Sequence, residues 1–155
     1  MTVAEGDRAR IVSVNISEKT GEKKHDVRCC MALEGHGIEG DAHAGDWHRQ
    51  VSLLAVESID KMRLAGLDVW PGDFAENLTT QGIELVSLPV GSRLMVGGRV
   101  LLEVTQIGKE CSEPCAIYYA AGDCVMPREG IFTRVLEGGE IEVGDDIVLL
   151  EGGDA

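Results

Sequence analysis

The sequence predicts a mainly β fold, an antiparallel barrel-like arrangement with one or two short helices. About seven short segments are apolar or alternate between polar and apolar residues, which is typical of strands. The chain contains 20 glycines and 4 prolines, a composition that suits many tight turns between short strands. One amphipathic segment has helical spacing. The chain has 155 residues, which is enough for one domain over residues 1–155 with a single core.

The first elements are predicted to form a hairpin. Residues 8–17 alternate polar and apolar side chains, and Thr20-Gly21 is a turn signal. Residues 23–31 would then return as a second strand. Cys29 and Cys30 lie in this strand, where thiols as small core or edge residues are the favoured interpretation.

Residues 33–50 form a glycine- and histidine-rich segment in which we expect no regular structure. Its polar side chains resemble those of a ligand-binding loop. The spacing matches no standard zinc pattern, so turn capping is favoured over metal binding for any one histidine. The potential metal ligands of this segment are His36, Asp41, His43, Asp46 and His48.

Residues 51–55 are predicted to be a short buried strand, followed by the helix 56–64. Apolar side chains recur at Val56, Ile59 and Met62 with charges between them, and Gly66 ends the helix. We expect the helix to pack on the outside of the barrel. Residues 70–82 are a loop, in which Glu76 and Asn77 stand between apolar neighbours as a polar pair.

Strands and turns are predicted from residue 85 onward. Gly97-Gly98 is a two-residue hairpin signal between strands 90–96 and 99–107, and Gly138-Gly139 turns strand 130–136 toward 140–143. The segment 143–149 repeats the pattern of 90–96: Val-Gly, two polar residues, then an apolar run. This similarity predicts that both strands enter the sheet in the same way.

The net charge of −13 argues against nucleic-acid binding and membrane-surface binding, because both require a basic face. The N-terminal residues resemble no signal peptide, and no apolar run approaches a membrane span. We therefore expect a cytoplasmic location, where the five cysteines stay reduced. A local basic pocket for a small anionic ligand is compatible with the charge.

The segment 106–124 is predicted to be the functional centre. It follows a buried strand, breaks it at Gly108, and places Cys111, Cys115 and Cys124 in a loop. A thiol becomes a thiolate when a positive charge or a helix N-terminus lowers its pKa. Such a thiolate suits a metal or a persulfide sulfur. The candidates to lower the thiol pKa and to hold a phosphate are Lys109, Arg49, Arg128 and Arg134.

Eight short stretches, taken together and in order, resemble the MOSC domain. This domain forms the C-terminus of molybdenum-cofactor sulfurases and also occurs alone in bacteria. They are Gly-Asp-Ala-His-Ala-Gly at 40–45 with Arg-Gln-Val-Ser-Leu-Leu at 49–54, Gly-Asp-Phe-Ala-Glu-Asn-Leu-Thr-Thr at 72–80, Val-Gly-Ser-Arg-Leu at 90–94, Glu-Val-Thr-Gln at 103–106 with Pro-Cys at 114–115, Gly-Ile-Phe-Thr-Arg-Val-Leu at 130–136, and Val-Gly-Asp-Asp-Ile at 143–147.

The resemblance implies a barrel-like fold that binds a molybdenum cofactor, either to handle or sulfurate it or to use it in small-molecule redox chemistry. It makes Cys115 the essential cysteine, as thiolate ligand to the metal or as sulfur carrier, and places Glu76, Asn77, Asp41 and His43 at the cofactor. Pyridoxal phosphate is not expected on this chain, because the family's desulfurase domain is missing. A molybdoenzyme or a cysteine desulfurase is the expected protein partner.

Two alternatives stay open: a non-catalytic accessory protein or chaperone for a molybdoenzyme, and a zinc or redox-thiol module built on Cys111, Cys115 and Cys124. The cysteine spacings are no zinc signature. Whether the chain is an enzyme by itself is also open. We expect the loops 40–48, 73–80 and 109–115 to converge on one pocket.

Overall fold

The computed structural model describes residues 9–18, 24–42, 44–74, 76–108 and 130–150. In chain order its elements are β1 (Arg10–Ile16), β2 (His25–Asp26), β3 (Cys29–Leu33), β4 (Gly37–Ile38), β5 (Val51–Ala55), α1 (Val56–Leu64), β6 (Leu78–Gln81), the 3-10 helix η2 (Leu85–Ser87), β7 (Arg93–Val96), β8 (Val100–Ile107), β9 (Ile131–Glu137), β10 (Gly139–Glu142) and β11 (Ile147–Leu150).

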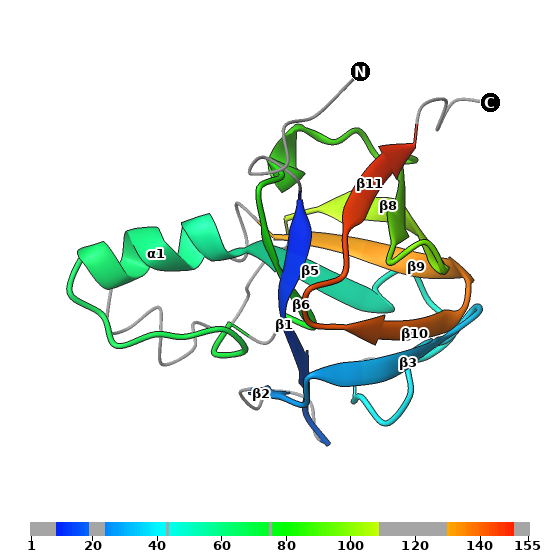
Figure 1. The fold of residues 1–155 in the computed structure, drawn as a ribbon, viewed down its shortest axis with the longest axis horizontal. Coiled ribbons are helices and arrows are strands. Elements are labelled where there is room, and N and C mark those ends of the chain that lie inside the picture. The colour runs from blue at the N-terminus through cyan, green and yellow to red at the C-terminus, as the bar shows by residue number, and fades with distance from the viewer. Residues whose placement is uncertain (1–8, 19–23, 43, 75, 109–129, 151–155) are drawn as a thin grey trace.

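The strands form two sheets that wrap around a shared interior (Figure 1). One sheet has eight strands in the order β11-β7-β8-β9-β5-β6-β1-β2, and the other has three in the order β10-β3-β4. The pairings are antiparallel except for β5 and β6, which are parallel and joined through α1. The predicted mainly β, barrel-like fold with a short helix is confirmed.

The large sheet is not a closed barrel, but its ends approach one another. Arg10 at the start of β1 forms an isolated antiparallel bridge with Asp146, just before β11. Two backbone bonds of 2.9 Å flank it, from the N–H of Ile11 to Asp145 O and from the N–H of Ile147 to Ala9 O. This bridge satisfies backbone groups that an open sheet edge would expose.

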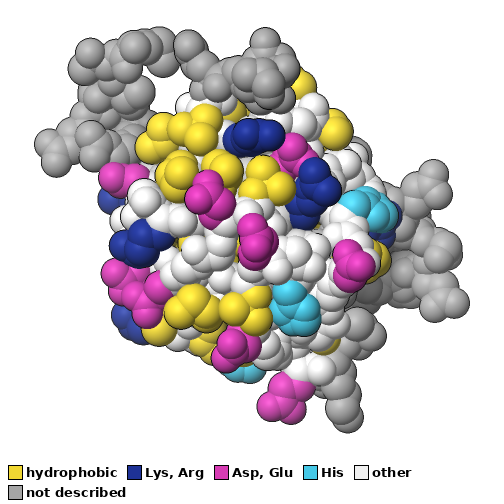
Figure 2. Space-filling view, turned by 90° about the vertical axis from the view of Figure 1, so that its right-hand side faces the viewer, with side chains coloured by type: hydrophobic (Ala, Val, Ile, Leu, Met, Phe, Trp, Pro, Cys, Tyr) yellow, Lys and Arg dark blue, Asp and Glu magenta, His cyan; other side chains and the backbone are white. Residues whose placement is uncertain are grey.

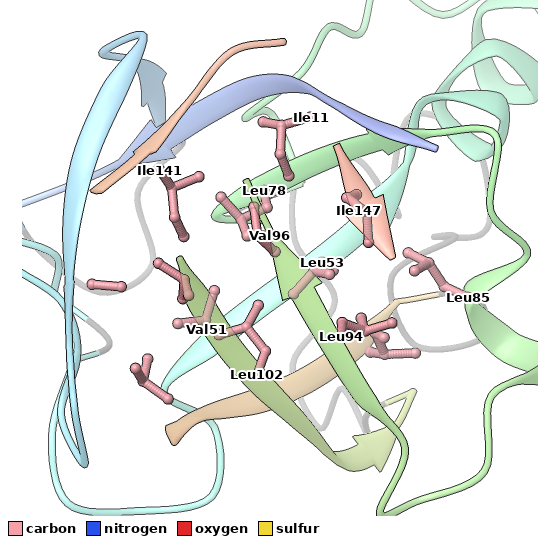
Figure 3. Packing of buried hydrophobic residues seen from close by; sticks show 14 of the residues in the cluster. Ile11, Val51, Leu53, Leu78, Leu85, Leu94, Val96, Leu102, Ile141 and Ile147 are labelled. Carbon is pink, nitrogen blue, oxygen red and sulfur yellow. The ribbon is translucent and has the colours of Figure 1, made fainter. Parts of the chain in front are cut away.

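The core lies inside the curved sheets. Leu53, Leu94 and Leu102 are fully buried there, and Figure 3 shows their side chains directed into one interior together with those of β1, β6, β10 and β11. Few of these side chains are aromatic, as the composition predicts.

The helix α1 packs on the outer face of the sheet. Because side chains alternate along a strand, Leu53 points into the core while Leu54 faces the helix. Leu54 packs there with Ile59 and Met62 of α1 and with Phe132 of β9. Burial on both faces explains why four of the five residues of β5 are apolar, with Ser52 as the exception. The predicted helix bounds and its outside position are confirmed.

Three local predictions are wrong. Residues 23–31 form two strands, because Asp26 Oδ1 accepts the N–H of Arg28 at 2.7 Å and Arg28 adopts a φ of 68°, a turn that interrupts the strand. The chain then moves from β1 to the second sheet, where β3 pairs with β10. Residues 37–38 form the short strand β4 within the glycine-rich segment. The β7–β8 turn includes Arg99 as well as the two glycines, since Val96 pairs with Val100.

The repeated Val-Gly pattern marks two equivalent turns, as predicted. Gly91 and Gly144 have φ values of 98° and 95°, and each donates its N–H to a strand carbonyl at 2.8 Å. The strands that follow, β7 and β11, are antiparallel neighbours.

We predict that Gly72→Ala destabilises the protein much more than Gly66→Ala. Both glycines have positive φ, 93° and 100°, so each alanine incurs about 1–2 kcal/mol of backbone strain. A Cβ on Gly72 would also lie 2.3 Å from Lys24 O, whereas a Cβ on Gly66 has no atom of the described residues within 4 Å. Urea unfolding should show at least about 2 kcal/mol of additional loss for Gly72→Ala. Equal losses would contradict the close packing of residue 72 on the segment before β2.

Candidate functional site

The predicted site residues that the structure describes lie in two places. Asp41, Glu76 and Asn77 belong to a buried polar network around the start of β6. Arg49 bonds Gln106 near the end of β8, and Arg134 lies in the middle of β9, in a cleft that residues 46–48 also line. His43, Lys109, Cys115 and Arg128 lie outside the described residues, as do Cys111 and Cys124.

The buried network contains an ion pair between Lys24 and Asp41. Lys24 Nζ lies 2.8 Å from Asp41 Oδ1, and both side chains are fully buried. Ser17 completes the pair: its Oγ accepts from Lys24 Nζ at 3.0 Å, and its N–H donates to Asp41 Oδ1 at 3.1 Å. Burial by itself raises the pKa of Asp41, but hydrogen bonds from Lys24 and Asn77 and the charge of Lys24 outweigh it and lower the pKa. Asp41 is therefore a carboxylate fixed inside the protein.

Asn77 connects the network to two strands. Its Oδ1 accepts the N–H of Ser52 on β5 at 3.0 Å, and its Nδ2 donates to Asn15 O on β1 at 3.2 Å. Asn15 in turn donates from Nδ2 to Glu76 O and to Thr79 Oγ1. The segments 40–48 and 73–80 thus meet in the buried network, and no residue of 73–80 lines the cleft described below. Residues 109–115, the third segment, lie outside the described residues, so convergence of the three segments on one pocket stays a prediction.

Glu76 is fully buried, and its carboxyl group holds the preceding loop. Its Oε2 accepts the N–H of Gly72 at 3.0 Å and the hydroxyl of Thr79 at 2.7 Å. Its Oε1 has no hydrogen-bond partner among the described residues. Burial raises the pKa of Glu76 from 4.5 to about 7, against the opposing effect of these hydrogen bonds. Glu76 and Asn77 therefore lie behind the surface, and a direct contact with a cofactor is still a prediction.

A cleft of about 340 Å³ lies beside Arg134 and is named here the His48 cleft. Its lining combines an exposed tryptophan, an imidazole, a guanidinium and two carboxylates with backbone of β9. The lining residues are Glu34, Gly35, Asp46, Trp47, His48, Gln50, Thr105, Arg134, Val135 and Leu136. Figure 2 shows basic, acidic and histidine side chains mixed on the face that it presents, without one dominant sign of charge.

Gln106 joins the His48 cleft to Arg49. Its Oε1 accepts from Arg49 Nε at 3.1 Å and lies 2.9 Å from His48 Nε2. The Arg49 guanidinium also stacks over Phe132, with its Cζ 5.1 Å from the ring centre. Two cationic or potentially cationic side chains therefore meet at one carboxamide oxygen, near the end of β8.

Arg134 forms an exposed salt bridge with Glu103, through its Nε at 2.8 Å and its Nη2 at 2.7 Å to the same oxygen. Because its side chain is 51% exposed, this pair is worth little in water, and an anionic ligand could replace Glu103 at modest cost.

The segment that carries Cys115 starts and ends beside Gln106. Ile107 pairs with Ile131, and the N–H of Gly108 donates to Gly130 O at 2.6 Å. Residues 109–129 therefore leave and re-enter the β8–β9 hairpin at a point two residues from Gln106. This places the attachment of the cysteine segment at the end of the hairpin where Arg49 and His48 lie.

Two larger cavities lie elsewhere, at α1. One of about 640 Å³ is bounded by Arg63, Leu67 and Trp70, and one of about 540 Å³ by Glu57, Lys61 and Leu85. Neither contains a predicted site residue, so we place the site at the smaller His48 cleft. Among the described residues, no group of three or more His, Cys, Asp or Glu side chains could hold a metal ion.

Sequence reasoning missed Lys24, Trp47 and Gln106 as site residues. Lys24 lies among other charged residues, so its burial leaves no signal in the sequence. Gln106 could have been found, because a polar side chain two residues before a strand-breaking glycine and a cysteine-rich segment lies at the base of the predicted functional loop. Within the described parts of the chain, no helix has the length and apolar character to span a membrane.

The family model described as "MOSC domain" matches residues 40–148. Among solved structures, YuaD from Bacillus subtilis aligns with a TM-score of 0.74 at 20% identity, covering 90% of this chain and 93% of that protein. YiiM from Geobacillus stearothermophilus aligns with a TM-score of 0.66 at 21% identity, covering 92% and 75%. YiiM from Escherichia coli gives 0.58 at 19% identity, covering 93% and 69%. No curated protein matches the sequence.

We predict that Lys24→Met lowers the free energy of unfolding by about 3–5 kcal/mol, because it leaves the Asp41 carboxylate buried without its cation. The double variant Lys24→Met/Asp41→Asn should recover part of this loss, since the neutral amide oxygen still accepts the Ser17 N–H. Urea unfolding measures both. A double variant that is less stable than Lys24→Met would show that the cost is not the unpaired charge.

Glu76 is predicted to make stability fall as pH rises. The raised pKa means that the folded state binds more protons than the unfolded state between 4.5 and about 7, so stability is lost across this window. Between about pH 5 and about pH 8, the free energy of unfolding of the wild type should fall by about 2 kcal/mol more than that of Glu76→Gln.

The control for Glu76 is Glu57→Gln. Glu57 is exposed and also accepts a glycine N–H, from Gly82 at 3.0 Å, so it makes the same kind of bond in water. If Glu76→Gln and Glu57→Gln give equal pH dependence in urea unfolding, burial of Glu76 is not what raises its pKa.

Proposed function

Because this chain belongs to the MOSC domain family, we propose that it binds a molybdenum cofactor at the His48 cleft, with Cys115 as the functional thiolate. The observation that carries the proposal is the meeting of Arg49 and His48 at Gln106, two residues before the segment with Cys115. In a chain of net charge −13, such a concentration of donors is unusual and suits an anionic ligand.

The residues of the cleft fit the chemistry of a pterin phosphate. A volume of about 340 Å³ lies within the range of roughly 300–1,000 Å³ that small-molecule sites occupy. Arg49 and Arg134 would hold the phosphate through paired N–H donors. The carboxylates of Glu34 and Asp46 suit the N–H groups of an aminopyrimidine ring, and Trp47 offers an exposed face for stacking.

Cys115 would supply the soft ligand. A thiolate binds a high-valent or soft metal well, and it can instead carry a persulfide sulfur. When bound, the cofactor supplies the two-electron redox chemistry of molybdenum, while the chain's own residues bind its phosphate and exclude competing ligands. Arg49 would supply a positive charge on this side of the site, and a nearby positive charge favours the thiolate over the thiol.

The two possible roles of Cys115 imply different partners. As a metal ligand it needs none for the bound state, although a molybdoenzyme could receive the cofactor. As a persulfide carrier it requires a separate cysteine desulfurase, since pyridoxal phosphate is not expected on this chain. Both roles need a reduced thiol, for which the cytoplasm is the appropriate compartment.

We expect wild-type chain from a molybdate-fed host to contain molybdenum and pterin, and Cys115→Ala to lose molybdenum. Arg49→Gln should retain about tenfold less pterin, because a charge-assisted hydrogen bond is worth about 1.5–3 kcal/mol. The control is Arg63→Gln, whose guanidinium stacks on Trp70 away from the cleft. Metal analysis, pterin fluorescence after oxidation and cyanide-released sulfur are the three measurements.

Several outcomes would redirect the assignment. Full cofactor content in Cys115→Ala would show that this thiol is not the ligand. Zinc bound in place of molybdenum would favour the thiol-module alternative. Cyanide-released sulfur without molybdenum would favour the sulfur-carrier role, and transfer of cofactor to a molybdoenzyme without turnover would favour an accessory protein.

A further inference from the structure

Gln106 lies where three parts of the molecule meet. Its Oε1 faces Arg49 Nε at 3.1 Å and His48 Nε2 at 2.9 Å, and its Nε2 donates to Gly108 O at 2.7 Å. One half-buried carboxamide therefore contacts the imidazole of the His48 cleft, the neighbouring guanidinium and the backbone directly before residue 109.

These contacts permit one orientation of the Gln106 amide. A guanidinium Nε–H can only donate, so the atom that faces Arg49 must be the carbonyl oxygen. A backbone carbonyl can only accept, so the atom that faces Gly108 O must be the NH₂ group. Because His48 Nε2 also faces the oxygen, it must carry a proton. In the neutral imidazole, the lone pair is consequently on Nδ1.

The backbone on both sides of Gln106 is held by further hydrogen bonds. The neighbouring Thr105 hydroxyl contacts both His48 O and Phe132 O, which fastens the residue before Arg49 to the β8–β9 hairpin. The 2.6 Å bond from Gly108 N–H to Gly130 O closes the same hairpin at the two ends of 109–129. A change at residue 106 therefore acts on the cleft and on the hairpin end together.

We propose that Gln106 is a positioning residue that holds His48 and Arg49 toward the cleft and fixes the backbone from which the Cys115 segment departs. Its neutrality is part of this role, because a carboxamide oxygen orients the guanidinium without cancelling its charge. A carboxylate in the same place would neutralise Arg49 and weaken any anion bound there. The inference rests on the proposed function in treating the ligand as anionic and Cys115 as functional.

The charged and titratable groups around His48 are known. Arg49 shares its acceptor, Asp46, Glu34 and Arg134 line the same cleft, and the ring of Trp47 stands edge-on with its centre 6.0 Å away. A carboxylate at residue 106 would place negative charge on the oxygen that now lies 2.9 Å from His48 Nε2 as a neutral acceptor.

The experiment compares Gln106→Glu and Gln106→Met with Gln81→Glu and Gln81→Met, all in the cofactor-free full chain. Gln81 is a matched control, because its Oε1 also accepts an arginine Nε–H, from Arg10 at 3.1 Å, at the exposed last residue of β6. Three readouts are used: the NMR titration of the His48 imidazole, assigned with His48→Gln; hydrogen exchange of the Gly108 amide; and the affinity for inorganic pyrophosphate.

Gln106→Glu should raise the His48 titration midpoint by about one pH unit, since a nearby carboxylate favours the imidazolium. It should also weaken pyrophosphate binding by about tenfold, as expected for the loss of one charge-assisted contact. Gln106→Met should speed Gly108 amide exchange by about tenfold, because the carbonyl of that residue loses its partner. The Gln81 variants should match the wild type in all three.

Gln106 variants that behave like the Gln81 variants would overturn the proposal. Gln106→Glu nearly preserves the shape of the side chain and its acceptor oxygen, so it gives an answer even if Gln106→Met does not fold. Failure of the proposed function would give a different result, because wild-type chain from a molybdate-fed host would then lack pterin and molybdenum. The Gln106 variants of the cofactor-free chain would still differ from the Gln81 variants in the three readouts.

Discussion

The buried ion pair between Lys24 and Asp41 is the constraint on which the arrangement of the other elements depends. Two charges taken fully out of water are tolerated only when each is paired and further hydrogen-bonded. Ser17, directly after β1, hydrogen-bonds both charged groups, and Asn77, directly before β6, hydrogen-bonds Asp41. The segments that carry these four residues must therefore come together before any of them is stable in the interior. The apolar core is compatible with several sheet arrangements, whereas the polar network is compatible with few.

The network also explains how a long glycine-rich segment becomes part of a binding cleft. Its beginning is held at Asp41, inside the protein, and its end is held at His48 and Arg49 by Thr105, Gln106 and Phe132. A segment fixed at both ends loses little further entropy when a ligand binds. Asp41, Glu76 and Asn77 therefore belong to the buried network, whereas Arg134 and His48 line the cleft and Arg49 is linked to it through Gln106.

The sequence predicted those features that depend on local periodicity. The helix Val56–Leu64 was predicted at its observed bounds, because its apolar residues recur at helical spacing and Gly66 follows it. The β5 strand was predicted because it is a short and mainly apolar run. The break at Arg28 was not predicted, since a side chain of Asp26 that bonds the backbone two residues later overrides a strand-like pattern. Burial of Lys24 and the meeting at Gln106 depend on residues distant in sequence, so no local pattern could show them.

The bridge between Arg10 and Asp146 has a consequence for how the chain acquires its structure during synthesis. The first strand lacks its neighbour at residues 145–147 until those residues, far later in the sequence, have been synthesised. Contacts of such long sequence separation incur a large loop-closure entropy before they contribute stability, and they slow folding. Until then the unpaired edges of β1 and β7 are open to other chains, which is a risk of aggregation. The bridge can therefore form only after the strands between β1 and β11 have been synthesised.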